Sequence, residues 1–339
     1  MSFFLCTFAQ VLRKMKVLRT NEQIDIRQWK TLTRESRTGT WFQSPAAYNF
    51  FASFPKFLTP FVFALTHNEI LRAVCVGFVT RETAVKQLFT RRAIILGGPA
   101  LADDCSQDEV EELMTAVRSK LQSQAIYIET RNFNDYSPWR EAFEKSGFAY
   151  RKHLNFHVDC TLDIKGCLSD NRKRQLNKST ALINENVNEA EINEWYSILV
   201  ELYRTKVKTP LWPIEFFLEA YRQRIAQFML VQHNGHIIGG SMVVTDGKCV
   251  YEWFECGLNM VYKEQYPSVK ATYAGMEWAK AHGCNRYDMM GAGEPNVPYG
   301  VRDFKSEFGG ELVEHGRFLC VCKPLLYQLG VLGVKMLKF

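Results

Sequence analysis

The sequence predicts an α/β (α+β) protein of two tandem domains, each with a mixed, mostly antiparallel sheet. Three observations support this class: the length of the chain, the alternation of strand-like and helix-like segments, and a shared element order in the two halves. At 339 residues the chain is too long for one ordinary hydrophobic core. Its composition, with 47% hydrophobic and 23% charged residues, is typical of a globular protein.

The first half contains strand signals on both sides of an amphipathic helix. Ser106 and Glu109 form a capping-box pattern, and the apolar residues that follow recur at helical spacing. Runs rich in β-branched and aromatic residues, bounded by turns such as Gly97-Gly98-Pro99, predict the strands. We expect strands at residues 61–65, 70–79, 92–96, 125–129 and 150–160, and helices at residues 46–52, 109–121 and 138–146.

The second half begins with helices and then repeats the order of the first. Pro213 and Pro267 stand at first-turn positions of helices, and Gly283 stands at a helix end. Asn234-Gly235 separates two strand-like runs, as in a β-hairpin. We expect helices that begin near residues 170, 192, 213 and 267, and strands at residues 228–232, 237–245, 250–256 and 287–290.

Short matches between the halves indicate a duplicated domain. Arg140-Glu141 and Lys145-Ser146-Gly147-Phe148 correspond in order to Arg302-Asp303 and Lys305-Ser306-Glu307-Phe308. The alternative is a coincidental similarity between two ordinary α/β domains. The expected divisions are an N-terminal extension at residues 1–14, domains at 15–160 and 161–323, and an apolar and basic tail at 324–339.

The stretch from Tyr287 to Arg317 is the strongest candidate for a functional site. An apolar run ends at Gly291 and opens into a loop that contains glycine and proline. Arg302, Asp303 and Lys305 follow directly. A strand that leads into such a loop, with charges gathered beyond it, is typical of a substrate site.

The chain resembles the Fem family, whose members carry two domains of the GCN5-related N-acetyltransferase (GNAT) fold in tandem. The resemblance covers roughly residues 15–329. Within the family, the sequence is most similar to the bacterial branch that is described only as Fem-related or GNAT-like. It is most specific at Asp288-Met289-Met290-Gly291 and at Phe304-Lys305-Ser306-Glu307-Phe308-Gly309-Gly310. The weaker blocks are Trp41-Phe42-Gln43-Ser44-Pro45, Asn171-Arg172-Lys173-Arg174-Gln175, Ile237-Ile238-Gly239-Gly240, Tyr251-Glu252-Trp253 and Tyr266-Pro267-Ser268.

Members of the Fem family are non-ribosomal peptidyltransferases that add amino acids from aminoacyl-tRNA to a peptidoglycan precursor. The resemblance therefore implies an aminoacyltransferase of bacterial cell-wall synthesis. Its implied partners are an aminoacyl-tRNA donor and a nucleotide- or lipid-linked precursor, and no tightly bound cofactor is implied. Two alternatives stay open: a CoA-dependent GNAT N-acyltransferase, and a non-catalytic module that uses the same fold to hold a ligand.

The loops that precede the two crossover helices do not resemble a standard CoA site. Such a site cradles a pyrophosphate on backbone N–H groups of a glycine-rich loop at a helix start. The loop at residues 259–267 has no glycine, and Pro267 supplies no N–H. The loop at residues 97–102 has glycines but lacks the spacing. An acyl-CoA donor therefore remains only the alternative to aminoacyl-tRNA.

Amide formation needs a positioned donor, a deprotonated amine and stabilisation of an oxyanion. The resemblance implies that Lys305 helps to position the acyl donor, and Arg302 can hold phosphate or developing negative charge. Asp288 is a candidate base, and Tyr251 is a candidate general acid. The alternatives are a solvated helix face for the two cations, a core aromatic for Tyr251 and a backbone-bonded carboxylate for Asp288.

Further residues are candidates for substrate binding. Arg172 and Arg174 lie in a basic cluster at a helix start, where the helix dipole disfavours positive charge, so a tRNA or nucleotide phosphate would suit them. The alternative is a basic helix that serves only solubility. Glu129 and Arg131 match positions where the family has substrate-facing polar residues, whereas a family lysine falls here on Phe50-Phe51. Two aromatic residues complete this group: Tyr299 and Trp253.

Composition also sets the expected environment. The net charge of +6 accommodates an anionic partner without requiring one. The cysteines form no CxxC pair and the histidines have no paired-ligand spacing, so reduced thiols, a cytoplasmic location and no metal are expected. The tail either caps the second domain or rests on the inner membrane surface, where a lipid-linked precursor would lie.

Overall fold

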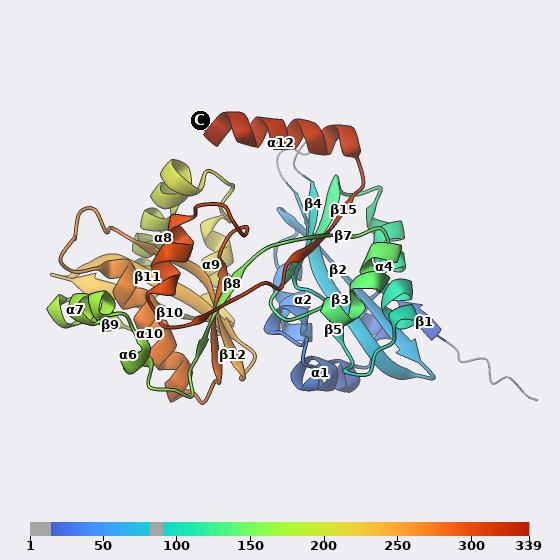
Figure 1. Ribbon diagram of the computed structural model, residues 1–339, viewed down its shortest axis with the longest axis horizontal. Coiled ribbons are helices and arrows are strands. Elements are labelled where there is room, and N and C mark those ends of the chain that lie inside the picture. The colour runs from blue at the N-terminus through green and yellow to red at the C-terminus, as the bar shows by residue number, and fades with distance from the viewer. Residues whose placement is uncertain (1–14, 82–90, 339) are drawn as a thin grey trace, which may run out of the picture.

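The computed structural model describes residues 15–81 and 91–338, and the predicted extension at residues 1–14 lies outside them. Two halves, each built on one mixed sheet, lie side by side (Figure 1). The predicted fold class, with two mixed sheets, is confirmed. No helix among the described residues is long and apolar enough to span a membrane.

The first sheet has the strand order β1-β2-β3-β4-β6-β15-β7, with the short β5 beside β3. All neighbouring pairs are antiparallel except β4 and β6, which are parallel. The strands are β1 (Met15–Leu18), β2 (Leu58–His67), β3 (Ile70–Thr80), β4 (Arg92–Gly97), β5 (Ala100–Leu101), β6 (Tyr127–Asn132), β7 (Ala149–Arg151) and β15 (Arg317–Val321).

The second sheet has the order β9-β10-β11-β12-β13-β8-β14 when read in the same direction. Here β12 and β13 form the parallel pair. The strands are β8 (Asn155–Asp159), β9 (Leu182–Asn184), β10 (Ala226–His233), β11 (His236–Thr245), β12 (Cys249–Gly257), β13 (Arg286–Gly291) and β14 (Glu311–Val313).

The two strand orders correspond position by position, and each half gives one strand to the other. β8 follows β7 in the chain but lies between β13 and β14. β15 follows β14 but lies between β6 and β7, so two crossing segments connect the halves (Figure 1). The predicted strand at residues 150–160 is therefore two strands in different sheets. The predicted boundaries at residues 160 and 323 place β8 and β15 with the wrong sheets, because sequence order does not reveal an exchange.

Helices cover the sheets and fill the space between the halves. Apolar residues of α4 pack on the first sheet, and those of α10 pack on the second. The helices are α1 (Ile26–Glu35), α2 (Pro45–Ala52), α4 (Gln107–Leu121), α5 (Arg140–Lys145), α6 (Ile164–Cys167), α7 (Asp170–Lys178), α8 (Glu189–Leu202), α9 (Ile214–Arg222), α10 (Pro267–Ala281), α11 (Gly300–Ser306) and α12 (Pro324–Lys338). Shorter turns of helix are η1 (Asn21–Gln23), η2 (Trp41–Gln43), η3 (Ser137–Trp139) and η4 (Tyr203–Val207).

One hydrophobic core runs continuously from the first half into the second. Its members come from α1, α2 and the first sheet on one side, and from α8, α9 and the second sheet on the other. Ring centroids of Phe50 and Phe216 are 5.0 Å apart, and those of Phe42 and Tyr251 are 5.5 Å apart. Such aromatic pairs add to the stabilisation from burial alone, so the halves form a shared core rather than a loose contact.

The parallel pairs of the two sheets differ in how far they stay together. β4 and β6 pair over their whole length, from Arg92 with Tyr127 to Gly97 with Asn132. β12 and β13 pair only from Cys249 with Arg286 to Tyr251 with Asp288 and then separate. The second sheet alone therefore opens between its two central strands, and residues 252–257 and 289–291 form the sides of this opening.

Candidate functional site

The opening between β12 and β13 is closed at one end by the side chain of Lys305. Its Nζ donates hydrogen bonds to the carbonyl oxygens of Met289 and, at 2.8 Å, Gly291. The residue between these carbonyls, Met290, has φ of +60°, and the pairing of β13 with β8 shifts register there. This irregular strand end turns both carbonyls toward one ammonium. Burial lowers the pKa of Lys305, and Glu252 acts in the opposite direction.

Two carboxylates of β12 line the same opening: Glu252, which is buried, and Glu255, which is half-buried. Glu252 Oε1 accepts hydrogen bonds from Thr272 at 2.8 Å and Tyr287 at 3.0 Å. Oε1 of Glu255 is buried without a hydrogen-bond partner among the described residues. Burial, reinforced by the charge of Glu252, raises the pKa of Glu255 to about 7. A carboxyl group whose pKa lies near 7 is suited to proton transfer, and the charge of Lys305 is near enough to act on that pKa.

The start of α10 borders this opening, but its first N–H groups are poorly available to a phosphate. Pro267 has no N–H, and Ser268 N donates to Asn259 Oδ1 at 3.2 Å. Asn259 Nδ2 also donates to Ser268 Oγ at 2.6 Å. The side chain of Asn259 therefore occupies the position at this helix start where a pyrophosphate would otherwise find donors.

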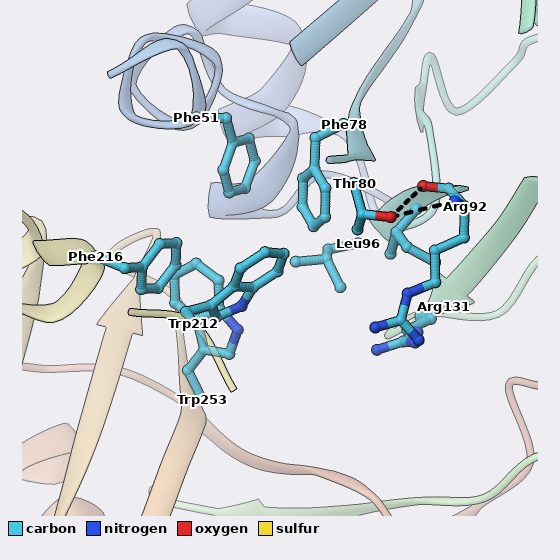
Figure 2. A pocket seen from close by; sticks show the side chains of 10 residues that line it. Phe51, Phe78, Thr80, Arg92, Leu96, Arg131, Trp212, Phe216 and Trp253 are labelled. Atoms are coloured by element: carbon cyan, nitrogen blue, oxygen red, sulfur yellow. Dashed lines mark hydrogen bonds between the residues drawn. The ribbon is translucent and has the colours of Figure 1, made fainter. Parts of the chain in front are cut away.

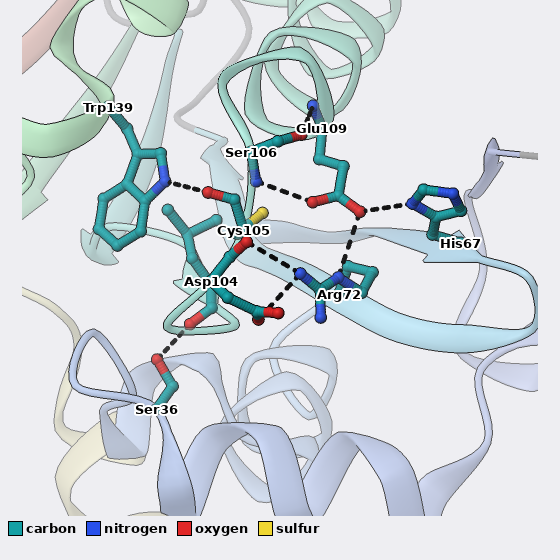
Figure 3. Close-up of polar contacts among 9 residues, drawn as sticks. Ser36, His67, Arg72, Asp104, Cys105, Ser106, Glu109 and Trp139 are labelled. Atoms are coloured by element: carbon teal, nitrogen blue, oxygen red, sulfur yellow. Dashed lines mark hydrogen bonds and ion pairs between the residues drawn. The ribbon is translucent and has the colours of Figure 1, made fainter. Parts of the chain in front are cut away.

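The corresponding helix start in the first half is also occupied. Figure 3 shows Glu109 of α4 among Ser106, His67 and Arg72. Its carboxylate accepts from Ser106 N at 2.8 Å, approaches His67 Nδ1 at 2.8 Å and pairs with Arg72 at 3.2 Å. Burial raises the pKa of Glu109, but these partners outweigh it and bring the pKa to about 2. An internal anion thus already takes the favourable end of the helix dipole.

Asp288 lies in β13 on the side of the sheet that faces the first half. It is fully buried, 3.2 Å from His157 Nε2, and it accepts a hydrogen bond from Met290 N at 2.6 Å. Burial opposes ionisation, but His157 and Arg286 outweigh it, so the pKa of Asp288 is lowered. A carboxylate with a lowered pKa and two partners is better suited to fixing the bend at Met290 than to acting as a base.

Arg302 and Tyr299 shape the loop between β13 and α11. Arg302 donates to the carbonyl oxygens of Ala292 at 3.1 Å, Glu294 at 2.9 Å and Val297 at 2.5 Å. Tyr299 is 41% exposed and its ring lies against Gly293, whose φ of +79° favours glycine. The loop that presents α11 and Lys305 is therefore held by Arg302, and Tyr299 remains available for contact with a ligand.

Tyr251 and Trp253 lie on the face of β12 opposite to Glu252, as alternation predicts. Tyr251 is fully buried, packs against Phe42 and donates its hydroxyl to Asp246 at 2.9 Å. Burial raises its pKa well above the usual value. The prediction that Tyr251 acts as a general acid is therefore not supported, because the hydroxyl is bonded in the core away from the opening.

Trp253 instead lines a cavity between the halves, together with Arg131. This cavity has a volume of about 60 Å³ and is bounded by Phe51, Phe78, Thr80, Arg92, Ile94, Leu96, Arg131, Trp212, Phe216 and Trp253. Figure 2 shows aromatic rings on one side and the two guanidinium groups on the other. The structure thus brings two predicted substrate-binding residues together from different halves.

Glu129 and Arg131 belong to an ion cluster beside the cavity. Glu129 pairs with Arg131 at 2.8 Å and with Arg317 of β15 at 3.2 Å. Burial raises the pKa of Glu129, but the two arginines outweigh it and bring the pKa to about 2. Arg317 also lies 2.8 Å from His153 Nε2, and burial and this charge lower the pKa of His153 to about 4. Glu129 is thus engaged within the protein, and Arg131 is the member of the pair that reaches the cavity.

The predicted basic surface on α7 is only partly formed. Arg172 is 6% exposed, with its guanidinium over the rings of Phe304 and Phe308 and 3.4 Å from Glu307. It therefore anchors α7 to α11 and is not free to bind a phosphate. Arg174 is exposed and donates to Asn171 at 2.8 Å, so it stays a candidate for substrate binding.

The sequence did not single out three groups that the structure places at these sites. Glu255 was missed because Trp253 forms a bulge: Met242 pairs with Phe254, and Val243 pairs with Glu252. The bulge brings residues three apart onto one face, which strict alternation excludes. Arg92 and Trp212 were missed because nothing in the sequence shows that β4 faces the segment before α9. Among the described residues, no cluster of three or more His, Cys, Asp or Glu side chains could hold a metal.

Two mixed sheets with an opened parallel pair and a crossover helix define a tandem GNAT-type acyltransferase fold. FemX has a TM-score of 0.69 at 11% identity, over 92% of this chain and 99% of that chain. A tandem GNAT protein from the clavulanic acid biosynthesis pathway has a TM-score of 0.59 at 9% identity, over 91% of this chain and 99% of that chain. L-PGS from Bacillus licheniformis has a TM-score of 0.54 at 12% identity, over 91% of this chain and 96% of that chain.

The sequence itself matches one family model. Residues 168–332, which include the opening, α11 and β15, match the FemAB family. No curated protein matches the sequence at a significant level. The resemblance to the Fem family is thereby confirmed, and the fold and this match support a transferase of the Fem type.

Proposed function

We propose that the protein is an aminoacyl or acyl transferase that forms an amide on an amine of a peptidoglycan or other cell-envelope precursor, with aminoacyl-tRNA as donor. The observation that carries this proposal is the opening between β12 and β13. It has Lys305 at its end, and in its wall Glu255 has one carboxylate oxygen, Oε1, without a hydrogen-bond partner among the described residues. The FemAB match over the same residues supports the reaction class.

The donor proposal is supported by the helix starts. A CoA donor needs a place for its pyrophosphate, and Asn259 and Pro267 take up that place at α10. An aminoacyl ester on a terminal ribose needs only the opening itself and a surface for the acceptor arm. Arg174 on α7 is an exposed cation that could serve this surface.

The proposed reaction assigns different roles to Glu255 and Lys305. The amine nitrogen of the acceptor attacks the ester carbonyl carbon, and Glu255 accepts the proton that the nitrogen loses. Two N–H groups of Lys305 are bound to carbonyls, and the third can stabilise the oxyanion that forms. When the C–O ester bond breaks, Glu255 returns the proton to the ribose oxygen, which leaves as a hydroxyl group, and the new amide remains on the acceptor.

The C-terminal helix supports a location at a membrane surface. Leu325, Leu329 and Leu332 recur at helical spacing in α12 and are 77%, 56% and 51% exposed. The sequence of α12 contains no acidic residue, and it includes Lys335 and Lys338. We propose that this helix rests on an anionic lipid surface, where a lipid-linked precursor would be within reach.

The experiment that tests the function supplies the purified protein with a mixture of charged tRNAs and either a nucleotide-linked or a lipid-linked peptidoglycan precursor. Mass spectrometry of the precursor should show the mass increase of one aminoacyl group, and deacylated tRNA in place of the charged tRNA should abolish it. Acetyl-CoA and longer acyl-CoAs serve as the competing donors. Transfer from acyl-CoA without any tRNA-dependent product would replace the proposal by CoA-dependent N-acylation. Ligand binding without turnover of any donor would favour a non-catalytic module.

A further inference from the structure

The cavity between the halves has walls of opposite chemical character. The aromatic wall consists of Trp212, Phe216 and Trp253 from the second half, with Phe51 and Phe78 above them (Figure 2). Trp212 and Phe216 are stacked at 5.6 Å, and Phe216 meets Trp253 edge-on at 5.2 Å. These rings are locked by one another, so they form a preformed apolar surface rather than a flexible one.

The facing wall carries an excess of positive charge. Arg92 and Arg131 both direct their guanidinium groups toward the cavity (Figure 2). Arg131 shares the single carboxylate of Glu129 with Arg317, and His153 beside them has its pKa lowered to about 4 and is neutral at pH 7. No acidic group of the described residues pairs with Arg92. The three arginines and one glutamate thus leave two positive charges at this wall.

Two guanidinium groups that lie close together beside apolar rings are stabilised when both bind the same anion. Each arginine offers a planar fork that matches a carboxylate or a phosphate, and the low polarity of the aromatic wall strengthens that pairing. A water-sized group needs roughly 10–15 Å³ of such a cavity. A volume of about 60 Å³ therefore admits a group of a few heavy atoms, such as a phosphate or a carboxylate with its neighbouring atoms, but not a nucleoside.

We propose that this cavity binds the anionic end of a small or elongated ligand, a carboxylate or phosphate that is joined directly to an apolar or aromatic body. Arg92 and Arg131 hold the anion, and Trp212 and Trp253 contact the apolar part. Trp253 lies in β12 between Glu252 and Glu255, so the ligand is placed across one strand from the proposed reaction centre. The assignment of this ligand as the acceptor rests on the proposed function, whereas its binding does not.

Phe51 is a further reason why this cavity does not suit a nucleotide. It is 1% exposed and contacts Phe78 with ring centroids 4.9 Å apart. A hydrophobic ring here supplies no donor to a second phosphate or to a sugar. The cavity therefore favours one anionic group on an apolar body over a chain of hydrated phosphates and sugars.

The test measures binding through the tryptophan fluorescence of Trp212 and Trp253, confirmed by titration calorimetry on the full chain. The probes are phenyl phosphate, benzoate, inorganic phosphate, uridine diphosphate and benzyl alcohol. We expect saturable binding of phenyl phosphate or benzoate, at least tenfold tighter than inorganic phosphate and uridine diphosphate, and no binding of benzyl alcohol. The preference between the first two probes identifies the anion as phosphate or carboxylate.

Matched variants make the result specific to this cavity. Arg92→Gln should weaken binding of the best probe about tenfold, whereas Arg91→Gln, the same change one residue away and outside the cavity lining, should leave it unchanged. Trp212→Phe should weaken the aromatic probes but not inorganic phosphate. If Arg92→Gln proves unstable, Arg92→Lys, which keeps the charge but loses the fork, should still weaken binding. Absence of saturable binding for every probe, or equal affinity in wild type and Arg92→Gln, overturns the proposal. A failure of tRNA-dependent transfer leaves this binding result untouched.

Discussion

Glu252 and Glu255 are three residues apart in β12 and both face α10, because Trp253 is bulged out of the ladder between them. The two carboxylates nevertheless differ in environment. Glu252 has two hydroxyl donors, and Glu255 has a buried oxygen with none among the described residues. One bulge thus places two acids on one face of β12. Burial raises the pKa of both, and only Glu255 has an oxygen without a donor among the described residues.

Glu255→Gln should abolish most of the transfer activity while it stabilises the fold at alkaline pH. The pKa of about 7 means that the base is present above neutral pH, so the wild-type kcat/KM should rise through an acid limb near pH 7. In the variant, kcat should fall at least a hundredfold, and the rise of kcat/KM near pH 7 should disappear. Glu264→Gln, an exposed change nearby, is the control.

The raised pKa of Glu255 also predicts how the stability of the Glu255→Gln variant depends on pH. The folded pKa lies above the ordinary value of 4.5, so ionising Glu255 costs folding free energy as the pH rises from about 4.5 through 7. The cost is on the order of 1–3 kcal/mol at pH 8, and Glu255→Gln removes it. Urea unfolding at pH 5 and pH 8 should show equal stability at the lower pH and a more stable variant at the higher pH. A variant that is less stable at both would show that Glu255 is already satisfied.

Lys305→Met should remove catalysis and leave donor affinity largely intact. The change deletes the ammonium that is proposed to meet the oxyanion, so single-turnover rates should fall at least a hundredfold. It also leaves the carbonyls of Met289 and Gly291 without their donor, at a cost of roughly 1–3 kcal/mol in stability. Activity at 10 °C, where the variant remains folded, separates the two effects. Lys263→Met on the exposed loop is the control, and equal loss in both variants would argue against the proposed role.

Glu129→Gln should destabilise the protein at neutral pH and much less in acid. The carboxylate holds Arg131 and Arg317 together, and its removal leaves two partly buried cations unpaired, which costs roughly 3 kcal/mol. The folded pKa of about 2 lies below the ordinary 4.5, so this contribution is complete above pH 4.5 and is lost as the pH falls toward 2. Unfolding measured from pH 3 to 7 should show the difference grow with pH, whereas the exposed Glu112→Gln should show none.

The exchange of β8 and β15, together with the shared core, predicts that the two halves unfold together. Calorimetry should show one transition whose calorimetric and van't Hoff enthalpies agree. Phe143→Ala removes the ring that stacks on Phe318 of β15 at 4.0 Å and should lower the stability of the whole protein by roughly 3–5 kcal/mol. Two transitions that move separately in this variant would contradict the prediction.

Much of the fold could be predicted because it depends on local signals. The capping box at Ser106, the prolines at helix starts and the turn at Asn234-Gly235 act within a few residues, and the structure confirms them. Lys305 was identified by its resemblance to a family motif rather than by geometry. The structure, however, shows what binds its ammonium: two carbonyls at an irregular strand end.

The rest depends on contacts that sequence order hides. The bulge at Trp253 is a matter of register with β11, and the exchange of β8 and β15 involves strands far apart in the chain. Arg172 looked like part of a basic surface, but Phe304 and Phe308, more than a hundred residues later, cover its guanidinium. The burial of Tyr251 was hidden for the same reason, since Phe42, which packs against its ring, comes from the other half.

The exposed leucines of α12 lead to the last prediction, which concerns lipid surfaces. α12 lies across the end of the first half (Figure 1), where the ring of Tyr327 lies 5.5 Å from that of Tyr127, and its three leucines are exposed. Leu325→Gln, Leu329→Gln and Leu332→Gln combined change side chains that are at least half exposed, so stability should change by less than about 1 kcal/mol. Sedimentation with vesicles that contain phosphatidylglycerol should recover the wild type and lose the triple variant. Vesicles of phosphatidylcholine alone should bind both weakly, because the lysines then lack anionic headgroups. Equal sedimentation of wild type and variant would contradict the membrane role and would leave α12 as a cap on the fold.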